Sequence, residues 1–141
     1  MRWLIWVLVY LTFTAGAMAQ QADWSIHADA DTLASGSFPS RTATRIAWDT
    51  AKDSAWFRLA QKESRISWQA RLVITDSTDS ILWQKDLGGS GLILLPADRF
   101  PQWLDTKRQF RLYLEFHPAD PSIALRSQRS LLAFFTLNKD P

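Results

Sequence analysis

Hydrophobic and polar residues alternate over two stretches of the chain, residues 66–75 and 109–117. Successive side chains of an extended strand point to opposite faces, so a period of two indicates a strand with one buried and one solvated face. We therefore expect two strands whose inward residues are Ile66, Trp68, Ala70, Leu72 and Ile74 in the first, and Phe110, Leu112, Leu114 and Phe116 in the second.

Shorter apolar runs predict further strands at residues 23–27, 41–49, 54–61, 81–87, 92–95 and 131–137. We expect residues 92–95, a continuous apolar run, to be buried on both faces. Residues 29–39 are predicted to be a connection with Phe38 on the core, and residues 97–107 an irregular or one-turn helical crossover. About eight short strands with turns every 8–12 residues favour an all-β fold, a two-sheet antiparallel β-sandwich of 7–8 strands.

The chain opens with one positive charge, an apolar run and small residues ending at Ala19. This is the layout of a cleaved secretory signal peptide, and an uncleaved membrane anchor is the alternative. We expect cleavage after Ala19, a single domain over residues 20–141 and no stable membrane span after cleavage. Its location is then periplasmic or secreted, and a Gram-negative envelope fits best because the chain has no cysteine for disulfides.

Charge adds little to this picture. The formal net charge of the whole chain is +2, and Arg2 is the one charged residue before position 20. The mature domain is therefore close to neutral, which argues against nucleic acid as a partner.

The second half of the chain resembles the later strands of immunoglobulin-like and fibronectin type III-like domains. The resemblance lies in W-Q-A-R-L-V-I-T-D at residues 68–76 and F-R-L-Y-L at residues 110–114, together with residues 82–84, 92–96 and 133–137. It implies a β-sandwich that binds protein or sugar, or acts as a spacer, without a conserved catalytic apparatus.

Candidate catalytic and metal-binding residues are sparse. The imidazole bases are His27 and His117, and no G-x-S-x-G nucleophile elbow is present. A small hydrolase is therefore the third alternative, and no cofactor or metal is expected. Aspartates 29, 31, 76 and 79 could contribute oxygen ligands to calcium, but turn formation explains them better.

One group of residues indicates a protein-binding surface. If the strands at 66–75, 109–117 and 131–137 share a sheet, their outward residues meet, and arginine, tyrosine and phenylalanine beside aliphatic residues are typical of binding patches. The alternative is that the 118–130 loop covers this face, or that the last strand is buried on both faces. The predicted protein-binding residues are Arg71, Val73, Arg111, Tyr113, Leu132 and Phe134.

Tryptophans offer a second kind of binding site. Trp56 faces away from the apolar residues of its strand and Trp103 lies in a predicted loop, so either could be an exposed platform for a sugar ring. Our first hypothesis is therefore a non-catalytic exported β-sandwich protein that binds another protein of the bacterial cell envelope. A carbohydrate-binding module that uses Trp56 or Trp103 is the alternative.

Overall fold

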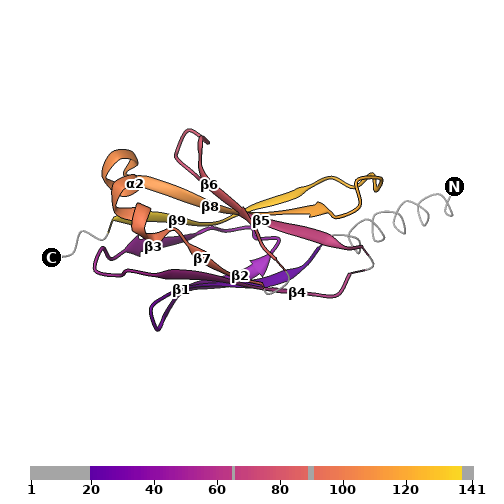
Figure 1. Ribbon diagram of the computed structural model, residues 1–141, viewed down its shortest axis with the longest axis horizontal. Helices are drawn as coiled ribbons and strands as arrows, with labels where there is room; N and C mark the ends of the chain where they lie inside the picture. The colour runs from indigo at the N-terminus through magenta and orange to yellow at the C-terminus, as the bar shows by residue number, and fades with distance from the viewer. Residues whose placement is uncertain (1–19, 65, 89–90, 138–141) are drawn as a thin grey trace, which may run out of the picture.

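The computed structural model describes residues 20–64, 66–88 and 91–137, which form two stacked β-sheets (Figure 1). The predicted all-β sandwich is confirmed, with nine strands among the described residues. The elements in chain order are β1 (Ala22–Ala28), β2 (Asp31–Phe38), β3 (Thr44–Trp48), β4 (Ala55–Gln61), β5 (Trp68–Thr75), β6 (Ile81–Asp86), β7 (Leu92–Leu95), the 3₁₀ turn η1 (Ala97–Arg99), α2 (Phe100–Lys107), β8 (Gln109–Pro118) and β9 (Gln128–Leu137).

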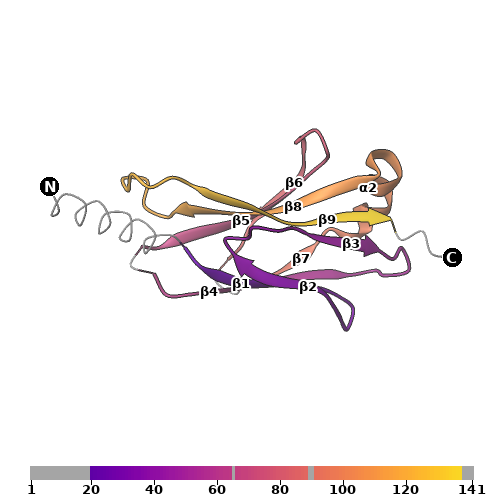
Figure 2. The same ribbon diagram turned by 180° about the vertical axis from the view of Figure 1, so that it is seen from behind.

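The strands divide into a four-stranded sheet, β2-β1-β4-β7, and a five-stranded sheet, β3-β9-β8-β5-β6. The chain crosses from the first sheet to the second between β2 and β3. Neighbouring strands are antiparallel, except that β3 pairs in parallel with β9. In Figure 2, β3 runs beside β9 along the edge of the sandwich.

The alternation that predicts β5 and β8 also sets their register. Leu72 of β5 lies opposite Leu114 of β8, and Ala70 lies opposite Phe116. Directly opposed residues point to the same face of the sheet, so the inward residues of both strands enter the space between the sheets. The predicted inward residues of β8 are all fully buried, namely Phe110, Leu112, Leu114 and Phe116.

Aromatic rings fill the core beneath α2. The ring centroid of Phe100, at the start of α2, lies 4.7 Å from that of Phe110 and 4.9 Å from that of Trp48. Phe110 in turn stacks on Phe135 at 4.6 Å. Positions i, i+3 and i+4 share one face of a helix, and in α2 these are the buried Phe100, Trp103 and Leu104. The prediction that Trp103 could be an exposed platform was therefore wrong, because an eight-residue helix forms where an irregular or one-turn helical crossover was expected and turns Trp103 into the core.

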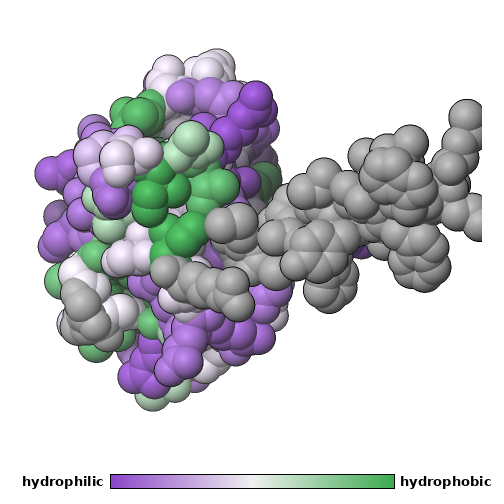
Figure 3. Space-filling model, turned by 90° about the vertical axis from the view of Figure 1, so that its right-hand side faces the viewer, coloured by the Kyte–Doolittle hydropathy of each residue, from purple (hydrophilic) through white to green (hydrophobic). Residues whose placement is uncertain are grey.

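At the other end of the sandwich, no helix of the described residues covers the core. Figure 3 shows this end, where hydrophobic residues gather near the centre and hydrophilic residues surround them. Ile66 before β5 and Leu125 before β9 are partly buried and pack against the core here. The predicted signal peptide, residues 1–19, lies outside the described residues, and none of the described helical segments is long and apolar enough to cross a lipid bilayer.

Residues 31–38 form strand β2, although the sequence predicted a connection there. The strand forms a hairpin with β1 after Asp29, whose φ is 51°. Its outward residues are polar, and Gly36 lies opposite Trp24, where a Cβ atom would meet the indole ring at 2.9 Å. The Trp24 ring fills the space beside Gly36, so β2 needs few apolar side chains of its own. Its sequence therefore lacks the alternation of apolar and polar residues that would predict a strand. Phe38 is buried as predicted.

Strand β7 also differs from its prediction. Leu92 and Leu94 are 46% and 51% exposed, while Ile93 and Leu95 are buried. The strand lies at the edge of the four-stranded sheet, and the other sheet covers only its inner face. A continuous apolar run here is thus half-buried and leaves two leucines in solvent.

Removing a core ring should destabilise the whole domain. We expect Phe110→Ala to lower the free energy of unfolding by about 3–5 kcal/mol, because it deletes a buried ring and leaves a cavity. The exposed Leu92→Ala should change it by less than about 0.5 kcal/mol. Urea unfolding followed by tryptophan fluorescence measures both, and equal effects of the two substitutions would contradict the described core.

Candidate functional site: the outer face of the five-stranded sheet

The three strands expected to share a sheet do so, with β8 between β5 and β9. Their outward residues form rows across the sheet. In one row Phe134 of β9 lies between Arg45 of β3 and Arg111 of β8. In the next row Leu131 of β9 lies beside Tyr113 of β8. We call this surface the arginine–aromatic face, and define it as Arg45, Arg111, Tyr113, Arg129, Leu131 and Phe134.

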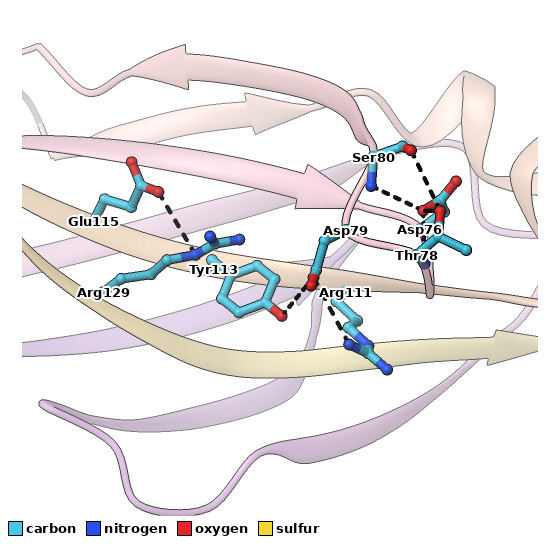
Figure 4. A network of polar contacts seen from close by, with 8 residues as sticks. All are labelled: Asp76, Thr78, Asp79, Ser80, Arg111, Tyr113, Glu115 and Arg129. Carbon is cyan, nitrogen blue, oxygen red and sulfur yellow. Dashed lines mark hydrogen bonds and ion pairs between the residues drawn. The ribbon is translucent and has the colours of Figure 1, made fainter.

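Tyr113 lies at the centre of this face. The guanidinium carbon of Arg129 is 3.8 Å from the centroid of the tyrosine ring, a cation–π contact. The tyrosine hydroxyl points to Asp79 in the β5–β6 loop, with 3.5 Å between its oxygen and Asp79 Oδ1 (Figure 4). Tyr113 remains partly exposed, with Arg129 over its ring and Asp79 near its hydroxyl.

Carboxylates balance part of the positive charge. Glu115 Oε1 lies 3.6 Å from Nε of Arg129, and its Oε2 lies 3.3 Å from Nε2 of His117. Arg71 Nε donates to Asp86 Oδ1 at 2.7 Å. This hydrogen bond and the charge of Asp86 hold the pKa of Arg71 above its ordinary value. The side chains of Arg71 and Arg129 are thus already engaged within the protein.

Phe134 and its two arginine neighbours are less engaged. Arg45 Nε donates to Thr136 Oγ1 at 3.3 Å. Among the described residues, no carboxylate lies within ion-pair distance of Arg45. Arg111 Nη1 lies 3.9 Å from Asp79 Oδ1, a long ion pair. The partly exposed Phe134 is therefore flanked in the sheet by two arginines that have spare donors.

Four of the six predicted binding residues, Arg71, Arg111, Tyr113 and Phe134, lie partly exposed on this outer surface. Val73 points outward but is only 2% exposed, because it lies between Tyr113 on β8 and Gln84 on β6. Leu132 is fully buried. The placement of Val73 and Leu132 on the accessible surface was therefore wrong.

A β-bulge explains the error at Leu132. The register of β8 against β9 shifts between Leu112 and Tyr113, so that Ala133 faces Leu112 and Leu131 faces Tyr113. The extra residue, Leu132, turns into the core, and Leu131 takes the outward place. Strict alternation carried through the bulge assigns these two leucines to the wrong faces.

Sequence reasoning missed three members of this face, Arg45, Arg129 and Leu131, and it missed the contact that Asp79 makes with the face. Arg45 was recognisable as an outward residue of its strand, but its place beside Phe134 depends on the parallel pairing of β3 with β9. Arg129 lay in a predicted loop, whereas β9 begins at Gln128. Asp79 reaches the site from a turn, where no periodic pattern exists.

The turn that carries Asp79 is built around Asp76. Asp76 Oδ1 accepts hydrogen bonds from the backbone N–H groups of Thr78 and Ser80 and from the Thr78 hydroxyl, at 2.9, 3.0 and 2.7 Å. These bonds, with the Thr78 hydroxyl contributing most, hold the pKa of Asp76 below its ordinary value. The role of Asp76 in turn formation is confirmed. Among the described residues, no group of three or more potential metal ligands occurs.

His117 makes contacts that resemble part of a hydrolytic triad. Its Nδ1 lies 2.6 Å from the Ser127 hydroxyl and its Nε2 lies 3.3 Å from Glu115. In serine proteases the hydroxyl contacts Nε2 and the carboxylate contacts Nδ1. Here the order is reversed and Ser127 is exposed. The contacts are those of a histidine that joins the β8–β9 connection to Glu115.

The outer face of the four-stranded sheet carries a different group. Trp56 of β4 is 37% exposed, as predicted, and lies opposite Leu94 of β7 and His27 of β1. Unlike Trp103, it is available to a ligand.

Comparisons with known proteins give no family assignment: no protein-family model, no curated protein and no solved structure matches this chain.

Acidification should weaken the β5–β6 turn. Because the folded-state pKa of Asp76 is lowered, its contribution to stability is present above the unfolded-state pKa and is lost as pH falls through the folded-state value. We expect Asp76→Ala to lower the melting temperature at pH 7. Between pH 5 and 2, the variant should then lose less stability than the unmodified protein does. The matched control is the exposed Asp53→Ala, which should alter neither. An unchanged acid response in Asp76→Ala would contradict the assignment.

Proposed function

We propose that this chain is an exported, non-catalytic β-sandwich protein of the bacterial envelope that binds another protein through the arginine–aromatic face. The observation that carries the proposal is that Tyr113 and Phe134 remain partly exposed on a sheet face lined with arginines. Tyrosine and arginine are enriched where interfaces gain most of their binding energy. The layout of residues 1–19 supports export.

Strand order supports the further proposal of an immunoglobulin-like fold. In immunoglobulin domains one sheet has the order A-B-E-D, and the other contains G-F-C, extended by C′ in variable-type domains. The order β1-β4-β7 corresponds to A-B-E, and β9-β8-β5-β6 corresponds to G-F-C-C′. Strand β2 is then an addition outside β1.

The state of the side chains also favours binding. The Arg129 contact fixes the Tyr113 ring before any partner arrives, so little rotamer entropy is lost when a partner covers it. Val73 and Thr75 beneath the surface are buried, so they support the exposed rings from below. The face is therefore preorganised, which raises affinity without adding contacts.

A second candidate function is carbohydrate binding at Trp56. Its exposed indole lies beside Leu94 on the outer face of the four-stranded sheet, and a flat aromatic ring can stack on a sugar. The buried Trp103 no longer supports this alternative.

Site-specific crosslinking tests the first function. A photo-reactive phenylalanine analogue is placed at position 134 of the full chain, which is expressed in the bacterium from which it comes. We expect illumination to give one discrete crosslinked complex with another protein. Substituting Tyr113→Ser in that variant should reduce the adduct by about tenfold or more, as loss of an interface hot spot does.

The matched control carries the analogue at position 56, on the opposite sheet. A crosslink to the same protein with equal yield from position 56, or no crosslink from position 134, would contradict the proposal. Circular dichroism of each purified variant establishes that the sandwich is intact.

The carbohydrate alternative makes its own prediction. Binding of an oligosaccharide from a broad glycan panel should quench tryptophan fluorescence, and Trp56→Ala should abolish the concentration-dependent quenching while Trp83→Ala leaves it. No quenching by any member of the panel would exclude sugar binding at Trp56.

A further inference from the structure

We propose that the arginine–aromatic face binds an extended acidic segment of its partner, whose carboxylates take the place of Asp79 over Arg111 and Tyr113 and pair with Arg45. This inference rests on the proposed function and specifies the chemistry of the partner.

The position of Asp79 indicates that the centre of the face can bind a carboxylate. Its Oδ1 lies 3.5 Å from the Tyr113 hydroxyl oxygen and 3.9 Å from Arg111 Nη1 (Figure 4). A hydroxyl donor and a guanidinium thus converge on one carboxylate oxygen. Both contacts are long, and the Asp79 side chain is 66% exposed. A carboxylate that approached along the face could make shorter, charge-assisted hydrogen bonds to the same two donors.

The turn does not depend on Asp79 for its shape. Asp76 accepts the hydrogen bonds that hold the turn, through the Thr78 and Ser80 backbone and the Thr78 hydroxyl. Asp79 contributes a backbone bond to Asp76 and a φ of 64°, a conformation that asparagine also adopts readily. The Asp79 carboxylate can therefore leave Arg111 without loss of the turn, and Asp79→Asn removes its charge at little structural cost.

Arg45 provides a second position for a carboxylate. Strands β3, β9 and β8 are adjacent, so the backbones of Arg45 and Arg111 are about 9–10 Å apart, with Phe134 between them. Alternate residues of an extended segment are about 6.5–7 Å apart and point to the same side. Two acidic residues at alternate positions therefore match two long arginine side chains, and the backbone between them crosses the Phe134 ring.

Charge distribution concentrates recognition on these two arginines. Arg71 and Arg129 have Asp86 and Glu115 at 2.7 and 3.6 Å. Arg45 has no such partner among the described residues, and the partner of Arg111 is held loosely. An acidic segment would gain two ion pairs at the cost of one long one.

A peptide-display experiment tests this inference with the full-length protein, purified after export. A random library of twelve-residue peptides is selected on it, and we expect peptides with two acidic residues at alternate positions to be enriched. For a selected peptide, Arg111→Gln and Arg45→Gln should each raise Kd by about tenfold, and Asp79→Asn should lower Kd by about threefold. These opposite signs are specific to competition by Asp79.

Matched controls lie on the opposite sheet. Arg58→Gln on β4 and Asp23→Asn on β1 make the same changes in charge far from the face, and both should leave Kd unchanged. Higher salt should weaken binding of the acidic peptides, and melting curves show whether each variant folds.

The outcomes separate this inference from the proposed function. If neutral or apolar peptides are enriched and lose binding in Tyr113→Ser or Phe134→Ser, the face binds protein but the acidic partner is wrong. If Asp79→Asn weakens the acidic peptides, Asp79 assists binding instead of competing, and the inference is overturned. If no enriched peptide depends on any residue of the arginine–aromatic face, both the inference and the proposed function fail.

Discussion

The structure depends on the packing of large side chains between two sheets, because the chain contains no cysteine and the described residues hold no metal-binding cluster. At one end Phe100, Phe110 and Phe135 contact one another with centroids 4.6–5.3 Å apart. At the other end Phe38 meets Phe116 edge to face at 4.7 Å. The rings in each of these contacts come from different elements, so the same contacts that bury apolar area also fix how the elements lie against each other.

This rigidity is transmitted to the outer surface. Each outward residue of β8 is a sequence neighbour of a fully buried one, so Arg111 and Tyr113 cannot shift along the sheet without moving Leu112. The spacing of arginines and aromatic rings on the arginine–aromatic face is consequently set by the core, and only the ends of the side chains adjust. Under the proposed function, this face would select a partner by spacing as well as by charge.

The sequence predicted those parts of the fold in which one physical pattern dominates. β8 alternates without interruption over its length, and its faces were assigned correctly. β2 escaped prediction because a glycine, Gly36, occupies the inward position opposite Trp24 and the outward residues of the strand are polar. Leu132 was misassigned because a bulge adds one residue to β9. Val73 was misassigned because side chains of the neighbouring strands cover it, and the alternation within β5 gives no sign of that cover. The site was found only in part, since Arg45 and Asp79 reach it through long-range pairing and a turn.

The placement of β9 has a consequence for how the five-stranded sheet assembles. This strand lies between β8 and β3, yet it follows every other described strand along the chain. Until β9 pairs, β3 has no partner in its sheet and one side of β8 is unpaired, so the folding chain exposes hydrogen-bonding edges that other chains can join. A chain without β9 would retain every inward residue of β8 and still leave β3 outside the sheet. Assembly of the sheet is thus coupled to residues 128–137, and aggregation before β9 docks is the hazard that this topology carries.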